Sequence, residues 1–320
     1  MTSVFTHPAC LEHEVAPGHP ESPRRLGVLL ERLGADGRFA IHQAAPAARE
    51  AILAAHPEHY LRYLEEIAMR GGGVLDPDTA MNRQSWDAAL GAAGAVLAAV
   101  QSALDGTPAF AAVRPPGHHA LADRAMGFCL LGNVVIGARA AQRAGRERVL
   151  IVDWDVHHGN GTQAMVERDP GIRFVSLHQW PAYPGTGRAE ERGVGNVFNV
   201  PMPPGRPPGE YVEGLWQAVL TAGRDWQPDL ILISAGFDAM KGDPLAGFTL
   251  EPEHYADLTT RLLDQFPGVP IAAALEGGYV PSRLADGVLA HLGALAVSRG
   301  NWGQTPINQG PWPTPTWGSG

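Results

Sequence analysis

Residues 149–161 read Val-Leu-Ile-Val-Asp-Trp-Asp-Val-His-His-Gly-Asn-Gly, and this stretch decides the fold. The apolar run 149–152 predicts a buried strand over 149–153, and the Gly-Asn-Gly that follows predicts a loop. Side chains two apart on a strand share a face, so Asp153, Asp155 and His157 are expected to point into one crevice. Carboxylates and imidazoles packed this closely after a buried run would be costly without a metal ion or a proton to organise them.

Strands and helices alternate outward from this stretch. Apolar runs at 110–113, 174–178, 230–234 and 271–275 predict further buried strands. Near-continuous apolar strands separated by helices indicate a parallel sheet that is covered on both faces. We therefore expect an α/β protein with one domain and three layers, in which helices flank a mostly parallel central sheet.

Two helices are expected before these strands, and composition predicts where the domain ends. An amphipathic helix is expected over 57–67 and is ended by the glycines at 71–73, and a long Ala-rich helix is expected over 82–104. The domain is expected to span residues 1–298. Residues 299–320 are expected to form a separate irregular tail, because residues 301–320 are rich in Pro and Trp and carry no charge.

Composition excludes several classes of protein. A net charge of −9 over 320 residues argues against a surface that coats nucleic acid. The two cysteines, Cys10 and Cys129, cannot form a disulfide framework, which fits a reducing cytoplasm. Residues 1–8 lack the features of a signal peptide, and no uncharged apolar stretch is long enough to span a membrane. We expect a cytoplasmic protein without nucleic-acid or membrane partners; a homo-oligomer is compatible with the sequence.

The loops that follow the predicted strands carry the chemistry. They lie at 114–119, 153–161, 238–244 and 276–279, and the carboxyl ends of parallel strands meet at one edge of a sheet. A catalytic zinc takes three protein ligands and keeps one position open for water. We expect these three ligands to be Asp155, His157 and Asp243, a set that Fe²⁺, Co²⁺ or Mn²⁺ could also accept.

Other groups in these loops fit proton transfer. His118 and His119 have side chains that titrate near neutral pH, and Asp153 is the natural partner of one of them. Asn160 could hold the other imidazole without adding charge. The hydroxyl of Tyr279 could stabilise a developing oxyanion. Asp238 is assigned a hydrogen-bonding role near the site and not a place among the ligands.

Five motifs together resemble those of a known family. They are Arg-Pro-Pro-Gly-His-His at 114–119, Asp-x-Asp-x-His-His-Gly-Asn-Gly at 153–161, Ser-Ala-Gly-Phe-Asp at 234–238, Gly-Asp-Pro at 242–244 and Glu-Gly-Gly-Tyr at 276–279. In this order they resemble the zinc-dependent histone deacetylase superfamily. The Asn at 160 and the Glu-Gly-Gly-Tyr spelling look like its class II branch, which includes bacterial histone deacetylase-like amidohydrolases and acetylpolyamine amidohydrolases.

The resemblance implies an arginase/deacetylase-like fold and a role for each matching residue. His119 would be the general base and then the acid, oriented by Asn160. His118, paired with Asp153, would be its electrostatic partner. Tyr279 would polarise the acyl carbonyl beside one zinc ion per chain. Further implied groups are the substrate-tunnel residues Gly127, Phe128 and Tyr183, and a structural K⁺ site at Asp153, Asp155, His157, Ser176 and Leu177.

The resemblance also bears on the substrate. Polyamine-selective members place a Glu on the tunnel rim seven residues after the Asp of Gly-Asp-Pro, and here that position is Leu250. A Leu lacks the charge that would attract a second ammonium group, so acyl-lysine-like or small acylated amine substrates are favoured over acetylpolyamines. Glu12, Glu14 or Glu251 could supply the missing charge.

Two further alternatives remain open. One is the arginase-like branch with two manganese ions, which needs more bridging carboxylates than these motifs offer. The other is an acyl-lysine-binding module without catalysis, which predicts a missing ligand, base or tyrosine, and none is missing. The prediction is therefore a metal-dependent deacetylase.

Overall fold

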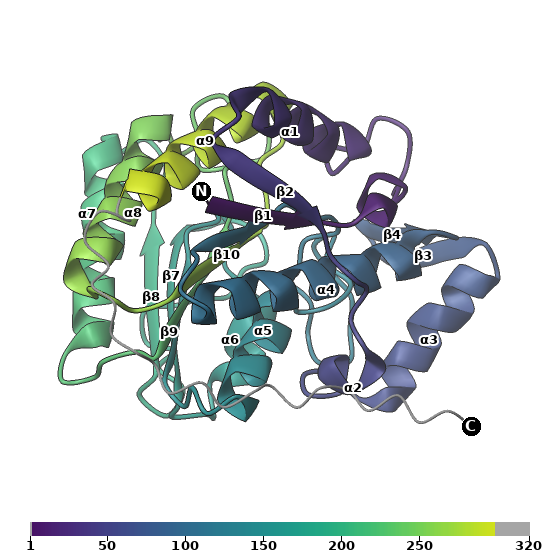
Figure 1. Ribbon diagram of the computed structural model, residues 1–320, viewed down its shortest axis with the longest axis horizontal. Helices are drawn as coiled ribbons and strands as arrows, with labels where there is room; N and C mark the ends of the chain where they lie inside the picture. The colour runs from purple at the N-terminus through teal and green to yellow at the C-terminus, as the bar shows by residue number, and fades with distance from the viewer. Residues whose placement is uncertain (1, 298–320) are drawn as a thin grey trace.

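Eight parallel strands form the central sheet of the computed structural model, which describes residues 2–297 (Figure 1). The predicted tail at 299–320 lies outside the described residues. The strands are β1 (Thr2–Thr6), β2 (Phe39–Gln43), β5 (Ala109–Ala111), β6 (Val149–Asp153), β7 (Ile172–Gln179), β8 (Val197–Met202), β9 (Leu230–Ala235) and β10 (Ile271–Leu275). Their order in the sheet is β2-β1-β5-β10-β9-β6-β7-β8.

Helices cover both faces of this sheet. The helices are η1 (Pro8–Leu11), α1 (Pro23–Asp36), α2 (Arg49–Ile52), α3 (Glu58–Met69), α4 (Ser85–Leu104), α5 (Asn133–Arg143), α6 (Asn160–Val166), α7 (Pro208–Gly223), α8 (Pro252–Gln265) and α9 (Pro281–Val297). Figure 1 shows α4, α5 and α6 on one side of the sheet and α1, α9, α8 and α7 on the other. The predicted three-layer α/β architecture is confirmed.

The central strands are buried from end to end. Every residue of β6, β9 and β10 is buried, as the apolar runs predict for strands with both faces covered. Asp153 at the end of β6 lies level with Ser234 of β9 and with Ser176 of β7. The loops after these strands therefore leave the sheet at the same edge, and this common edge brings together side chains that are far apart in the chain.

Helix α4 is the longest helix of the core. By length and composition alone it could cross a membrane, with a mean hydropathy of 1.4 over 18 residues. However, 67% of that window is buried inside the protein, where α4 packs on β1, β5 and β10. Its apolar character is accounted for by this core position.

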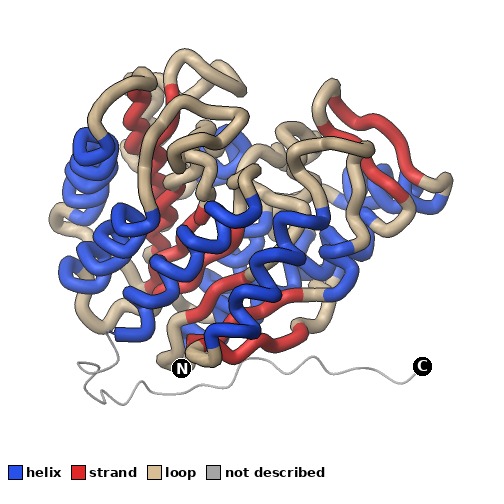
Figure 2. The backbone as a smooth tube through the Cα atoms, turned by 90° about the horizontal axis from the view of Figure 1, so that it is seen from above, coloured by secondary structure: helices blue, strands red, loops and turns tan. Residues whose placement is uncertain are grey.

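A two-stranded hairpin stands beside the main sheet. It consists of β3 (Gly72–Asp76) and β4 (Thr79–Asn82), paired antiparallel. The sequence analysis predicts only a helix end at residues 71–73 and a helix start at 82, whereas α4 begins at Ser85. Figure 2 shows this hairpin projecting from the body of the molecule, and Val74 is 76% exposed. Its strands are short, most of their side chains are half-buried, and they carry too few apolar residues at alternating positions to predict a strand.

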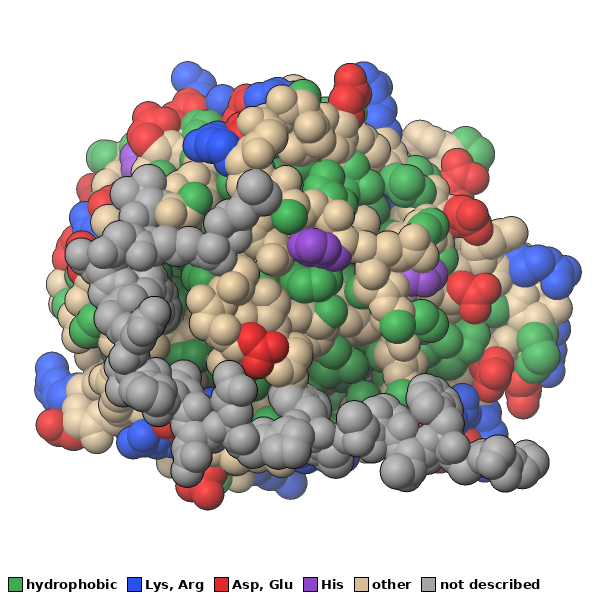
Figure 3. Space-filling model, viewed as in Figure 1, with side chains coloured by type: hydrophobic (Ala, Val, Ile, Leu, Met, Phe, Trp, Pro, Cys, Tyr) green, Lys and Arg blue, Asp and Glu red, His purple; other side chains and the backbone are tan. Residues whose placement is uncertain are grey.

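The surface charge is spread out. On the face shown in Figure 3, acidic and basic side chains both occur around the periphery, with hydrophobic side chains between them. The net charge of −9 is therefore not gathered into a single stripe on that face.

Candidate active site

Three side chains converge where strands β6 and β9 end. Asp155 and His157 follow β6, and Asp238 follows β9, which is its neighbour in the sheet. One ligand atom from each lies within 4.8 Å of the others, and all three residues are buried. Nδ1 of His157 lies 3.2 Å from Oδ1 of Asp155 and 3.2 Å from Oδ2 of Asp238. A single hydrogen on Nδ1 of His157 cannot form full hydrogen bonds to both carboxylates. A divalent cation among the three atoms could bind all of them, so this set of atoms fits a zinc-type site.

The prediction that Asp243 is a metal ligand stays a prediction, because its two hydrogen bonds leave further lone pairs on its carboxylate. Its Oδ1 accepts a hydrogen bond from the backbone N–H of Leu245 at 3.0 Å, and its Oδ2 accepts one from the N–H of Tyr279 at 2.8 Å. Asp238, which the sequence analysis assigns a hydrogen-bonding role, lies in the cluster of three and also accepts the N–H of Val156 at 2.9 Å. Both carboxylates come from the loop after β9, and the charges of Asp238 and Asp155 both act on Asp243. Asp243 thereby holds the backbone of Tyr279 next to the cluster.

Electrostatics around the cluster favour a cation. Burial, together with the charge of Asp155, raises the pKa of Asp238. Burial and then the charge of Asp238 raise the pKa of Asp243 to about 7. Burial disfavours charge on His157 as well, but its hydrogen bonds to Asp155 and Asp238 raise the pKa to about 10. Closely spaced buried carboxylates repel one another, and a bound positive charge relieves that repulsion.

The two adjacent histidines differ in environment. Nδ1 of His118 lies 3.0 Å from Oδ2 of Asp153, as predicted from the sequence. Burial opposes charge on His118, but Asp155 and Asp153 outweigh it and raise its pKa well above the ordinary value. Burial, followed by repulsion from His118 and His157, lowers the pKa of His119 well below the ordinary value. The surroundings thus favour the charged form of one imidazole and the neutral form of the other.

The tautomer of His119 follows from its partner. Oδ1 of Asn160 lies 2.7 Å from Nδ1 of His119, while the amide nitrogen of Asn160 donates to the sulfur of Met126 at 3.4 Å. An amide oxygen only accepts hydrogen bonds, so Nδ1 carries the hydrogen and Nε2 keeps a free lone pair. This arrangement leaves His119 able to take a proton.

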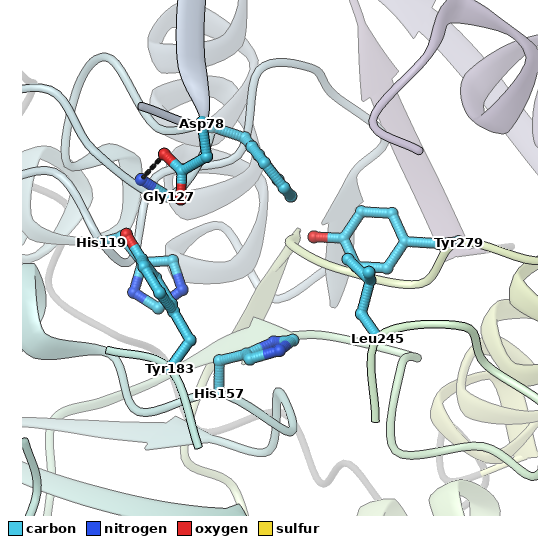
Figure 4. A pocket seen from close by; sticks show the side chains of 8 residues that line it. Asp78, His119, Gly127, His157, Tyr183, Leu245 and Tyr279 are labelled. Atoms are coloured by element: carbon cyan, nitrogen blue, oxygen red, sulfur yellow. Dashed lines mark hydrogen bonds between the residues drawn. The ribbon is translucent and has the colours of Figure 1, made fainter. Parts of the chain in front are cut away.

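A pocket of about 230 Å³ opens beside these groups (Figure 4). It is lined by Asp78, His119, Gly127, Phe128, His157, Tyr183, Leu245 and Tyr279. The sequence analysis predicts most of these residues to meet at one site, and the structure brings them together. Figure 4 shows the Tyr279 hydroxyl pointing across the pocket toward the side that carries His119 and Tyr183. The pocket therefore has aromatic walls, with imidazoles and a phenol facing its interior.

The prediction that Leu250 lies on the rim is wrong. Leu250 is 1% exposed and belongs to the main hydrophobic core. Its backbone pairs with Met240, because its N–H donates to the carbonyl of Ala239 and its carbonyl accepts from Lys241. The segment between these residues loops outward, and Leu245 from this loop lines the pocket with 39% of its surface exposed.

Asp78 is a second pocket residue that the sequence analysis missed. It lies in the connection between β3 and β4, and its Oδ1 accepts the backbone N–H of Gly127 at 3.1 Å (Figure 4). The only local signal was the Asp-Pro-Asp sequence at 76–78, which predicts a turn but not where that turn lies in space.

A buried ionic network lies behind the tyrosine. Arg25 donates to the backbone carbonyls of Glu276 and Gly278, each at 2.6 Å, and its guanidinium lies 4.8 Å from the centre of the Tyr279 ring. Burial raises the pKa of the Tyr279 phenol well above its ordinary value, although Arg25 opposes this. Oε2 of Glu276 accepts the N–H groups of Gly117 and His118 at 2.7 and 3.1 Å. The loops that carry the histidines and the tyrosine are therefore joined directly.

The chain is similar to known proteins in both sequence and structure. A family model described as the histone deacetylase domain matches residues 19–295. A histone deacetylase-like amidohydrolase of Pseudomonas aeruginosa is 40% identical over 309 residues, covering 87% of this chain and 81% of that protein. A probable deacetylase of Archaeoglobus fulgidus is 35% identical over 316 residues, covering 94% and 87%. The crystal structure of the HDA15 HD domain superposes with a TM-score of 0.88 at 35% identity, covering 92% of this chain and 90% of that one.

Proposed function

The chain belongs to the histone deacetylase family of amide hydrolases, and on this basis we propose that it removes acetyl or related acyl groups from acyl-lysine-like or small acylated amine substrates with one zinc ion. The observation that carries the proposal is the placement of His119. Its ring lines the pocket next to the cluster of Asp155, His157 and Asp238, and its Nδ1 is held by Asn160. A neutral base beside a metal-type cluster suits the hydrolysis of an amide by water.

The residues of the chain can perform each proton transfer. A zinc ion held by Asp155, His157 and Asp238 would supply Lewis-acid activation of water and of the acyl carbonyl. His119 takes a proton from the attacking water at Nε2 as the carbon–oxygen bond forms. The Tyr279 hydroxyl donates to the oxygen that becomes negative. His119 then gives its proton to the nitrogen as the carbon–nitrogen bond breaks, which releases the amine and the carboxylic acid.

His118 acts through charge. Asp155 and Asp153 favour the protonated form of His118, and after burial the charge of His118 is the next cause that lowers the pKa of His119. The ring centres of the two histidines lie 4.0 Å apart. This division of roles assigns proton transfer to His119 alone.

The walls of the pocket support a substrate with a narrow aliphatic arm. Phe128 and Tyr183 both line the pocket, and Tyr183 meets the His119 ring edge-on with ring centres 5.1 Å apart. The rim position is Leu245, which carries no charge for a distal ammonium group. Asp78 is the one carboxylate among the lining residues, and its Oδ1 is already engaged by Gly127 and Thr79. These features favour acyl-lysine-like substrates over acetylpolyamines.

A structural K⁺ ion is a further part of this proposal. Asp153 of β6 and Ser176 of β7 lie level in neighbouring strands and are fully buried. Hard oxygen ligands of this kind suit an alkali cation. Hydrolysis by enzyme prepared in K⁺ should exceed that in a buffer whose only monovalent cation is tetramethylammonium; equal rates would argue against this ion.

The test is an acyl-substrate panel on metal-stripped enzyme reloaded with one metal at a time. We expect about one zinc per chain and release of acetate from acetyl-lysine peptides. His119→Ala should abolish release while zinc stays bound, whereas His59→Gln, which alters an exposed histidine on α3, should behave as wild type. Two manganese ions per chain would support the arginase-like alternative. A tenfold preference for N-acetylcadaverine over acetyl-lysine would support the polyamine alternative, and retained zinc without hydrolysis of any substrate would support a binding module.

A further inference from the structure

The Phe128 wall of the pocket is built on a strained turn. Met126 and Cys129 exchange both backbone hydrogen bonds, so Gly127 and Phe128 form the two-residue loop between them. Both loop residues have positive φ, +55° for Gly127 and +67° for Phe128. Paired positive φ values are typical of the type I′ turn, where Asn-Gly is preferred. A phenylalanine in this conformation is unfavourable, and such a residue persists only when its surroundings hold it in place.

The hairpin β3–β4 supplies the contacts that hold the turn. The backbone N–H of Phe128 donates to the hydroxyl oxygen of Thr79 at 2.9 Å, and the N–H of Gly127 donates to Oδ1 of Asp78 at 3.1 Å. The Thr79 hydroxyl in turn donates to the same Oδ1 at 2.7 Å. Thr79 therefore accepts and donates at once, and it is only 2% exposed. Removing its hydroxyl would leave the N–H of Phe128 without this partner.

The held turn touches both the substrate wall and the base. The Phe128 ring lines the pocket and meets the Tyr279 ring edge-on, with ring centres 5.9 Å apart. On the other side, a Cβ added to Gly127 would lie 2.3 Å from the His119 ring, so this backbone packs directly against the base. A displacement of the turn would move the wall first, because His119 is held independently by Asn160.

We propose that Thr79 is a positioning residue for the substrate channel, which acts through its hydrogen bond to the strained Phe128 turn. This inference rests on the proposed function for its kinetic test but not for its stability test. The hairpin thereby acquires a role in the reaction although it lies outside the central sheet. The expected signature is a defect in substrate binding, with the chemical step largely preserved.

The kinetic test compares Thr79→Val, which keeps shape and removes the hydroxyl, with Thr79→Ser, which keeps the hydroxyl. With an acetyl-lysine peptide, Thr79→Val should lower kcat/KM by about tenfold, mainly through KM, whereas Thr79→Ser should stay within about twofold of wild type. Thr260→Val is the matched control, because the hydroxyl of this exposed threonine bonds only within its own helix α8. Equal kinetics for Thr79→Val and Thr79→Ser would overturn the proposal.

A double-mutant cycle tests the coupling to the strained residue. Asn adopts positive φ more readily than Phe, so in a Phe128→Asn background the hydroxyl of Thr79 has less strain to oppose. We expect Thr79→Val to lower the urea midpoint clearly in wild type and much less in the Phe128→Asn background. Equal shifts of the urea midpoint in the two backgrounds would refute the proposed role of Thr79. Thr79→Ala provides the same comparison if Thr79→Val does not fold.

The two tests separate this inference from the proposed function. If wild-type protein hydrolyses no acyl substrate but the effect of Thr79→Val on the urea midpoint depends on Phe128, the proposed function fails and the role of Thr79 in holding the turn stands. If wild-type protein is active but neither kcat/KM nor the urea midpoint changes when the Thr79 hydroxyl is lost, the role of Thr79 fails and the proposed function stands.

Discussion

Replacing Asp238 or Asp243 with asparagine distinguishes the cluster seen in the structure from the one predicted by the sequence. Both changes keep side-chain shape and remove one charge. Asp238 contributes one of three ligand atoms that lie within 4.8 Å of one another. If the roughly 10–16 kcal/mol of a four-ligand structural zinc site is shared equally, one ligand contributes about 3–4 kcal/mol. Asp238→Asn should therefore weaken zinc binding by about two to three orders of magnitude.

Asp243→Asn should have a smaller and different effect. An asparagine offers one oxygen acceptor for the Tyr279 N–H, but its NH2 group then faces the N–H of Leu245, which loses its acceptor, so the cost is on the order of 1–3 kcal/mol. We expect zinc to remain and kcat to fall by about tenfold or less, because the tyrosine moves slightly.

The assay is zinc content after dialysis against a graded chelator, measured beside acetyl-lysine hydrolysis. Asp238→Asn should lose zinc at chelator concentrations at which wild type and Asp243→Asn keep it. The reasoning would be refuted if Asp238→Asn held zinc as wild type does while Asp243→Asn released it.

Three further predictions follow from the same geometry. Tyr279→Phe should lower kcat by about 10²–10³ in steady-state assays with little change in zinc content or in KM, because it removes one donor to the developing oxyanion. Leu245→Glu places a carboxylate on the rim and should raise activity on N-acetylcadaverine relative to acetyl-lysine. Leu250→Glu instead buries a charge in the core and should lower the urea midpoint. Burial opposes ionisation of Glu21, but Arg114 and Arg25 overcome it and lower its pKa to about 2. Its contribution to the free energy of unfolding, roughly 3 kcal/mol, should therefore be complete above pH 4.5 and lost as the pH falls toward 2. Over this range the urea midpoint of the wild type should fall more steeply than that of Glu21→Gln.

The parts of the fold that the sequence predicts well are those with strong local signals. Strands β6 and β10 have the predicted bounds, because each is a short apolar run with polar loop residues after it. The hairpin β3–β4 carries no such pattern, since its side chains are mostly half-exposed and its place depends on contacts with the distant turn at Gly127. Local periodicity holds no information about such contacts.

The candidate site shows the same division. His118, His119, Asp153 and Asn160 pair as predicted, because each follows a buried strand at the same sheet edge. Asp238 and Asp243 lie in one loop, and spacing alone does not reveal which carboxylate turns back toward the sheet. Leu250 was misplaced for a related reason: its loop returns to the core, where Leu250 pairs with Met240. The path of a loop is decided by tertiary contacts, which neither composition nor spacing records.

The segment at residues 19–23 shows most clearly how tertiary contacts decide the role of a loop. Its local signal is that of a loop leading into helix α1, yet Glu21 is fully buried and binds Arg25 and Arg114. A buried ion cluster is often no more stabilising than apolar packing, so stability alone does not account for it. Arg114 begins the loop that carries the histidines, and Arg25 holds the backbone before Tyr279. One carboxylate therefore fixes, through two guanidinium groups, the relative position of the base and the oxyanion donor, which lie 160 residues apart in the chain.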